Sequence, residues 1–296
     1  MIHPRMEDIG MKIITLEEVI EGIEDTRRER SVWHSLKETL IIILLGIICG
    51  ATSYVKIEMF AESKKEWLGS FLRLENGIPG AYTMRRVMMC IDSRTLHERF
   101  IDWMKCIAGE ISGVIAIDGK TARRTKDDMK KALHTVSAFA YERGLVLGQI
   151  ACEEKSNEIT AIPKLMQMLE IKGCIITIDA MGCQTGIAEA IVGKEADYVL
   201  AVKENQETLY NDIKLYAENE MLPVPASELS VGAYHTTINK GHGRIERRKY
   251  YVCNDISWLA CSKWAGISGF GLCVSRIEEN GLIRTAHRYY IYSVKT

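Results

Sequence analysis

Two aspartates follow short apolar runs in the middle of the chain, and they are the first candidates for chemistry. Asp118 ends the run that begins at Val114, and Asp179 ends the run that begins at Cys174. An aspartate in such a place is often only a turn former or a helix cap. Two carboxylates at the ends of neighbouring strands, however, can bridge a pair of Mg²⁺ ions about 3.5–4 Å apart, which is the arrangement used for phosphoryl transfer. We therefore take Asp118 and Asp179 as candidate catalytic metal ligands.

The elements that must position these aspartates are predicted from hydrophobic periodicity and turn signals. The predicted segments are three strands over 114–118, 132–140 and 145–151, a helix over 159–171, a strand over 174–179, a helix over 187–192 and a strand over 198–202. The order β-β-β-α-β-α-β is the ribonuclease H-like pattern, an α/β fold in which a mixed sheet carries helices on both faces. In such a sheet the strands that end at Asp118 and Asp179 are neighbours.

Two glutamates are candidates for a third acid. Glu158 starts the predicted helix after the hairpin strands, in the region where cellular ribonucleases H place a glutamate that faces the metal. The alternative is an acid that only stabilises the positive end of the helix dipole. Glu246 lies among Arg244, Arg247 and Arg248, and we interpret it as an ion-paired or solvated surface acid. Glu158 is therefore the third candidate catalytic residue.

Positive charge is concentrated in two short segments, although the formal net charge of the chain is only −1. Residues 120–131 contain six basic and two acidic residues, and residues 240–249 contain five basic and one acidic residue. Such segments are either solvated loops or contacts to the phosphates of DNA. The candidate DNA-binding residues are Lys120, Arg123, Arg124, Arg244, Arg247, Arg248 and Lys249.

The regions on either side of this centre have different characters. Apolar residues keep helical spacing from Ser31 to Met59, and a further helical pair is predicted over 83–108. The last part of the chain is rich in aromatic and β-branched residues and predicts several short strands. We therefore expect three domains: a helical N-terminal domain over 1–110, a catalytic core over 111–220 and an inserted β-rich segment over 221–296.

Composition is that of a globular protein, with 47% hydrophobic residues, 26% charged residues and five prolines. Its nine cysteines contain no CxxC pair, and no signal peptide is recognised, so we expect reduced thiols and a cytoplasmic protein. The apolar run Leu40–Ala51 is about twelve residues long, against roughly twenty needed to span a bilayer. It predicts a buried helix and no membrane association.

The sequence also resembles a known family. The strings that carry the resemblance lie at 27–30, 33–34, 46–51, 117–121, 134–139, 147–149, 155–160, 177–184, 196–201 and 241–246. Together they are similar to insertion-sequence DDE transposases of the H-repeat-associated type and to the N-terminal domain associated with them. The resemblance implies a ribonuclease H-like catalytic domain, Mg²⁺ or Mn²⁺ as cofactor, and cleavage and strand transfer of double-stranded DNA at insertion-sequence ends. Asp118 and Asp179 fall on its first two catalytic acids.

The sequence departs from the family pattern in two places. The family's third acid is expected on a helix after the inserted strands, near a tryptophan-x-x-glutamate-asparagine string, and residues 221–296 contain no such glutamate. Arg124 follows Arg123 where members typically have glycine. We therefore expect a truncated or decayed copy that stops before the final helix.

Three functions remain open at this point. The first is a metal-dependent DDE transposase, incomplete or inactive, that acts as a homo-oligomer or with an intact homologous transposase. The second is a catalytically dead remnant that still binds DNA or such a transposase. The third is a ribonuclease H-like nuclease that uses Glu158.

Overall fold

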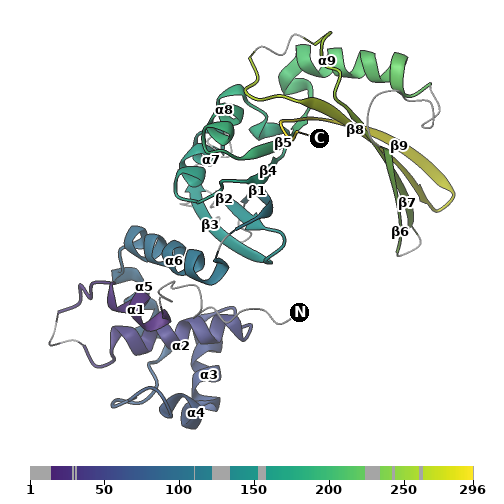
Figure 1. Cartoon of the computed structure of the whole chain (residues 1–296). Coiled ribbons are helices and arrows are strands. Elements are labelled where there is room, and N and C mark those ends of the chain that lie inside the picture. Colours follow the sequence, from purple (N-terminus) through teal and green to yellow (C-terminus); the bar gives the residue numbers. More distant parts are fainter. Residues whose placement is uncertain are drawn as a thin grey trace, which may run out of the picture. The chain divides into compact units, whose positions relative to one another are not determined.

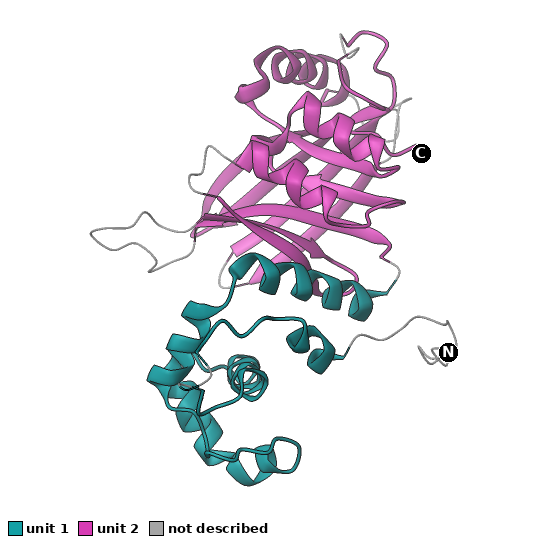
Figure 2. Ribbon diagram, turned by 90° about the vertical axis from the view of Figure 1, so that its left-hand side faces the viewer, with its two compact units in different colours: residues 1–109 teal, residues 110–296 magenta. Residues whose placement is uncertain are grey.

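The computed structural model describes residues 15–28, 30, 32–109, 111–121, 134–152, 158–223, 234–241, 244–259 and 263–295. The chain divides into two compact units, Met1–Gly109 and Glu110–Thr296, which Figure 2 shows in different colours. Each unit is described by itself below. The division of the second unit at residues 220–221 stays a prediction.

The first unit is helical (Figure 1). Its helices are α1 (Leu16–Glu21), α2 (Leu36–Ile48), α3 (Tyr54–Ser63), α4 (Lys65–Gly69), α5 (Ala81–Cys90) and α6 (Ser93–Ala108). The core forms around α2, where Ile42 is completely buried, and α4 and α5 contribute Leu68 and Met84, which are also completely buried. The apolar run that begins at Leu40 is helical as predicted, but it is buried only in part, because Ile47 and Ile48 at its end are exposed. No described helix is long and apolar enough to cross a membrane.

The helical pattern predicted over 31–59 is interrupted in the structure. Gly50 adopts a φ of 88°, in the left-handed region that side chains disfavour, and α2 ends just before it. Ser53 then caps α3, because its hydroxyl accepts a hydrogen bond from the Lys56 N–H at 3.3 Å. Apolar spacing alone carries no sign of this break, because both helices bury residues against one core.

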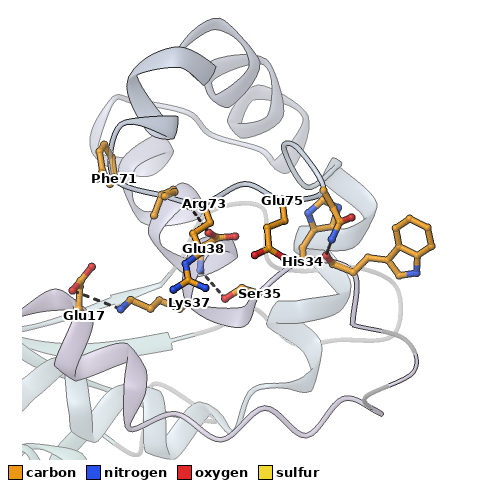
Figure 3. Close-up of a pocket in the computed structure, with 11 residues that line it drawn as sticks. Glu17, His34, Ser35, Lys37, Glu38, Phe71, Arg73 and Glu75 are labelled. Carbon is orange, nitrogen blue, oxygen red and sulfur yellow. Dashed lines mark hydrogen bonds and ion pairs between the residues drawn. The ribbon is translucent and has the colours of Figure 1, made fainter.

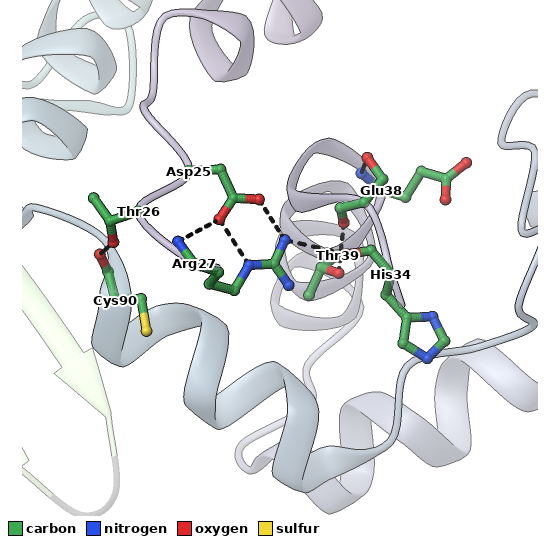
Figure 4. Close-up of polar contacts among 8 residues, drawn as sticks. Asp25, Thr26, Arg27, His34, Glu38, Thr39 and Cys90 are labelled. Atoms are coloured by element: carbon green, nitrogen blue, oxygen red, sulfur yellow. Dashed lines mark hydrogen bonds and ion pairs between the residues drawn. The ribbon is translucent and has the colours of Figure 1, made fainter. Parts of the chain in front are cut away.

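The segment between α1 and α2 is held by a charged pair (Figure 4). The Arg27 guanidinium donates to both carboxylate oxygens of Asp25, at 2.7 and 2.6 Å, and to the His34 carbonyl at 3.1 Å. These hydrogen bonds lower the pKa of Asp25 and raise that of Arg27. Thr26 donates to the Cys90 carbonyl at 2.8 Å, so the segment is also tied to α5. Arg27 therefore has a structural role in the string at 27–30.

The second unit is built on one large mixed sheet. Its strands are β1 (Gly113–Thr121), β2 (His134–Ala140), β3 (Leu145–Cys152), β4 (Cys174–Ile178), β5 (Asp197–Val202), β6 (Tyr234–Gly241), β7 (Arg244–Cys253), β8 (Gly269–Glu279) and β9 (Leu282–Tyr292). Its helices are α7 (Glu158–Gln167), α8 (Thr185–Gly193) and α9 (Glu207–Tyr216), with short turns η4 (Ala180–Gly182), η5 (Glu204–Gln206) and η6 (Ala217–Met221). The strand order is β3-β2-β1-β4-β5-β9-β8-β7-β6.

The first half of this unit has the predicted element order. Strands β1 to β3 pair antiparallel, and α7, β4, α8 and β5 follow, with β1, β4 and β5 parallel to one another. The order β-β-β-α-β-α-β is therefore confirmed. The boundary that matters for the site differs, because β1 continues to Thr121 and Asp118 lies within the strand.

The described helices of the second unit cover one face of the sheet, whereas helices on both faces were expected. Side chains alternate along β4 and β5, and those of Ile176, Ile178, Tyr198 and Leu200 are buried on one face. Helix α7 packs on β2 and β3, α8 packs on β5, and both lie on the same side in Figure 1. Helix α9 covers the same face further along, where the Tyr210 ring meets that of Tyr289 edge-on. Among the described residues of the second unit, no helix covers the opposite face, and we call it the open face.

The C-terminal β-rich segment extends this sheet. Strand β9 pairs antiparallel with β5, and β8, β7 and β6 continue outward. Strands β7, β8 and β9 have 10, 11 and 11 residues, so they are longer than the short strands predicted. Asn280 and Gly281 connect β8 and β9, and both have a positive φ, as a tight hairpin requires.

Candidate metal and DNA site

Asp118 and Asp179 lie on neighbouring parallel strands at matched positions. In the register of β1 and β4, Ile117 pairs with Ile178, and each aspartate is the next residue along its strand direction. Because side chains alternate along a strand, both aspartates belong to the open face, opposite the buried Ile117 and Ile178. Both residues are solvent-exposed. The prediction that their strands are adjacent in one sheet is confirmed.

The surroundings of Asp118 are polar. Lys120 lies on the same face, and its Nζ is 3.5 Å from Asp118 Oδ2. Ser137 of β2 is the partner of Asp118 across the ladder. Lys120 thus lies beside the candidate metal ligand, where an exposed ammonium can also meet a phosphate. Arg123 and Arg124, the other basic candidates next to it, are outside the described residues.

Asp179 begins a tight turn. Its Oδ1 accepts a hydrogen bond from the Met181 N–H at 3.1 Å, so Asp179 caps η4. Gly182 closes the turn against the sheet, because a methyl group there would overlap the side chain of Ile178. Cys183 follows and is completely buried, and this burial raises the pKa of its thiol to about 12. The turn therefore exposes Asp179 and Met181 while it buries Ala180, Gly182 and Cys183.

A groove of about 650 Å³ runs from Asp179 past the end of β5 to β9. Lys203, Glu204 and Asn205 line it from the β5 side, and Arg288 lines it from β9. The groove exists because β5 ends at Val202 while β9 continues beyond it into the long hairpin. Asp179, one of the candidate acids, thus lies at the wall of this groove.

Glu158 lies on the other side of the sheet. It is only 4% exposed and hydrogen-bonds to His134 Nε2, while His134 Nδ1 lies 2.8 Å from the Thr121 hydroxyl. Its carboxylate occupies the space that a side chain at Gly119 would take, and Gly119 alternates with Asp118 along β1. The structure thus brings Glu158 next to the backbone that carries Asp118, but on the helix-covered face. Its catalytic role stays a prediction.

The donor set suits a hard cation. Exposed carboxylates such as those of Asp118 and Asp179 are ligands that Mg²⁺ and Mn²⁺ prefer, and Mg²⁺ commonly uses only one or two of them together with substrate phosphates. Among the described residues, no three histidine, cysteine, aspartate or glutamate side chains cluster as a metal site. The residues present therefore fit a two-carboxylate site.

The basic segment in β7 is divided between the two faces. Arg244 and Arg248 flank Glu246 on the open face, with nitrogen-to-oxygen distances of 3.1 and 2.9 Å. Their hydrogen bonds and charge, Arg248 first, lower the pKa of Glu246. The interpretation of Glu246 as an ion-paired acid is confirmed. Arg247 and Lys249 alternate onto the opposite face, so they do not share a surface with the aspartates.

Several residues of this surface escaped the sequence analysis. Arg284 pairs with Ile277 of β8, and Arg288 pairs with Cys273. Directly paired residues share a face of the sheet, and both of these pairs lie on the open face. Their four-residue spacing within a predicted strand is a signal for a shared face. Asn205 was also missed, and an amide after a strand carries no comparable signal.

The first unit contains a separate groove of about 470 Å³ (Figure 3). Three of its charged side chains are engaged with one another or with the backbone. Glu38 accepts the N–H groups of Arg73 and Leu74 at 2.8 and 3.2 Å, and Lys37 pairs with Glu17 at 3.6 Å. This groove therefore lacks the excess of positive charge expected for phosphate binding.

Comparison with known proteins identifies the family. A family model described as "Transposase DDE domain" matches residues 110–266, which include both aspartates. The chain belongs to the DDE transposase family. A second model, described as "DDE_Tnp_1-associated", matches residues 17–104 of this transposase-family chain and so covers most of the helical unit.

Relatives of this transposase-family chain agree with the match. "Putative transposase YncI" of Escherichia coli O157:H7 is 40% identical over 292 residues, which is 96% of this chain and 73% of the relative. "H repeat-associated putative transposase YhhI" of Escherichia coli (strain K12) is 39% identical over 292 residues, with 96% and 76% covered. A piggyBac transposase synaptic complex with hairpin DNA aligns with a TM-score of 0.40 and 9% identity, over 96% of this chain and 60% of that one. The family assignment rests on the sequence matches alone.

Proposed function

We propose that this chain takes part in insertion-sequence transposition by cleaving DNA at a metal site formed by Asp118 and Asp179. The observation that carries the proposal is the β1–β4 register, which puts the two aspartates at matched positions on one exposed face. Membership of the DDE transposase family supports it. The strand order from β3 to β5 supports a ribonuclease H-like core.

Each part of the open face has a role in this proposal. Mg²⁺ or Mn²⁺, when bound, would supply Lewis acidity to activate water or a 3′-hydroxyl and to stabilise the leaving oxygen. Asp118 and Asp179 would hold the ion by their carboxylate oxygens. Both carboxylates are exposed on this face, so it is the surface on which we place the DNA duplex. Lys120 and Arg288 lie close to the aspartates, where they can contact phosphates. Such contacts position DNA but carry no base specificity.

Double-stranded insertion-sequence ends are the proposed substrate, because family membership and the basic residues of the open face point to the same partner. Arg244 and Arg248 extend this basic surface along β7, although Glu246 offsets part of their charge. Contacts of this kind give affinity that depends on salt, since each neutralised phosphate releases counterions.

A second function, DNA binding without efficient cleavage, is favoured by one observation. Two aspartates fix one ion, but within the described residues no third metal-ligating side chain joins them. A two-metal displacement needs further oriented oxygen ligands. We therefore propose a transposase-family protein with an incomplete site, whose DNA-binding surface is intact.

The test compares nicking of supercoiled DNA that carries the element's terminal repeats, with Mn²⁺, in single variants. Asp118→Asn and Asp179→Asn are expected to abolish nicking, and Asp212→Asn in α9 is the matched control that keeps it. DNA binding in all three should stay within a few-fold of the unaltered chain. Nicking that survives both site substitutions contradicts the proposed metal site, and DNA binding without any nicking in the unaltered chain establishes the second function.

A further inference from the structure

Two side-chain amides that follow β5 contact the turn that carries Asp179. The Asn205 Nδ2 donates to the Ala180 carbonyl at 2.7 Å, and the Gln206 Nε2 donates to the Cys183 carbonyl at 2.9 Å. We propose that Asn205 and Gln206 are positioning residues that hold the turn after β4, and with it the Asp179 carboxylate, in the geometry that binds metal. This inference rests on the proposed function, because it concerns the same site.

The two amides act on both ends of one short turn. Ala180 is the residue directly after Asp179, and Cys183 closes the turn. Gln206 Nε2 also lies 3.3 Å from Gln184 Oε1, which extends the contact to the start of α8. The other side of the turn is fixed by packing, since Gly182 sits against Ile178. The turn is thus held between the sheet and the residues after β5.

The location of the amides argues for positioning over general stability. Asn205 is exposed and Gln206 is half-buried, and neither belongs to the apolar core. A hydrogen bond of this kind contributes little net stability. Its effect on the orientation of the Asp179 carboxylate is larger than its effect on stability, because carboxylates that bind metals depend on neighbouring hydrogen bonds for their orientation. Asn205 and Asp179 also line the same groove, so the constraint acts at the proposed site.

The first test measures Mn²⁺ affinity of the full chain by electron paramagnetic resonance. Asn205→Ala and Asn205→Leu, which removes the donor but retains the size, are each expected to weaken Mn²⁺ binding about tenfold. Asn211→Ala, an exposed asparagine of α9, is the matched control and should bind Mn²⁺ normally. DNA affinity should remain unchanged in all of them, because Asn205 contacts the turn and not a phosphate.

The second test reads the turn itself without metal. Cys183 and Cys174 are both completely buried, one in the turn and the other in β4, so alkylation of both thiols is slow in the folded chain. If Asn205 holds the turn, Asn205→Ala should raise the alkylation rate of Cys183 several-fold and leave that of Cys174 unchanged. Faster alkylation of both thiols reports general unfolding and overturns the positioning role.

A comparison with Asp179→Asn separates failure of this inference from failure of the proposed function. If Asp179→Asn binds Mn²⁺ as well as the unaltered chain, Asp179 is not a ligand and both proposals fall. If Asp179→Asn loses Mn²⁺ while Asn205→Ala keeps normal Mn²⁺ affinity and slow Cys183 alkylation, only the positioning inference is overturned.

Discussion

Gly119 follows Asp118 in β1 and lies against the buried pair of Glu158 and His134. A methyl group at residue 119 would overlap the Glu158 carboxylate, which is buried and bound to His134. Gly119→Ala must therefore displace Glu158 from His134 or shift β1. We expect it to lower the free energy of unfolding by about 2–3 kcal/mol, measured by urea denaturation.

The matched control for this substitution is Gly186→Ala. Gly186 lies in α8 with open space where a side chain would be, so alanine there should leave stability equal or slightly higher. Equal stability of the Gly119→Ala and Gly186→Ala variants would show that the space beside Glu158 adapts at no cost.

Glu158→Gln distinguishes a supporting glutamate from a catalytic one. Glutamine keeps the shape and can still hydrogen-bond to His134, and the side chain stays on the face opposite Asp118. We expect Mn²⁺-dependent nicking to persist and stability to fall by about 1 kcal/mol. If nicking is abolished while the unfolding free energy is unchanged, Glu158 completes the metal site after all.

The residues of the site differ in how readily they can be predicted from the sequence. Asp118 and Asp179 each follow an apolar run, so the pattern alone predicts them at strand ends, although Asp118 lies inside its strand. Asn205 acts through a carbonyl that is 25 residues away in sequence, and this contact depends on the parallel β4–β5 pairing. No local signal reveals such a contact.

At the level of single elements, β7 shows how alternation divides a charge cluster. Arg244 and Arg248 belong to the open face, whereas Arg247 and Lys249 belong to the other. Replacing Arg244 and Arg248 together with alanine should weaken DNA binding and flatten its log–log salt dependence by roughly one unit per lost phosphate contact. Binding titrations at several salt concentrations measure this slope.

The double variant Arg247→Ala with Lys249→Ala removes the same amount of charge from the same strand, so it is the control. It should leave the salt slope close to that of the unaltered chain. An equal fall of the slope in both double variants would mean that DNA contacts the strand from both sides, or that only total charge matters.

The elements themselves were predictable where periodicity is local. The hairpin of β2 and β3, α7, α8 and β5 follow from spacing and turn residues. It was not predictable that helices would cover only one face of the sheet. The alternation of residues along a strand can be the same whether or not a helix covers the second face. The pairing of β5 with β9 could not be predicted from the sequence either, because it joins segments that are far apart along the chain.

For the whole molecule, the expected activity follows from the number of ligands. With two carboxylates and no third described ligand, the 296-residue chain should show weak Mn²⁺-dependent nicking and little or no strand transfer. Mn²⁺ is expected to work better than Mg²⁺, which demands more regular geometry. Incubation with terminal-repeat DNA and a target plasmid measures both steps, and efficient strand transfer in Mg²⁺ would disprove the incomplete-site proposal.

The β5–β9 ladder sets the order in which this molecule can fold. Tyr198 and Ser293, which hydrogen-bond beside that ladder at 2.9 Å, are 95 residues apart, whereas β1 to β3 and β6 to β9 are each built from sequence-adjacent pairs. Closing so long a loop costs more entropy than forming a hairpin, so the two halves of the sheet should form first and join late. During synthesis the edge of β5 that pairs with β9 stays unpaired until β9 has left the ribosome. This interval is when the nascent chain is most exposed to mispairing and aggregation.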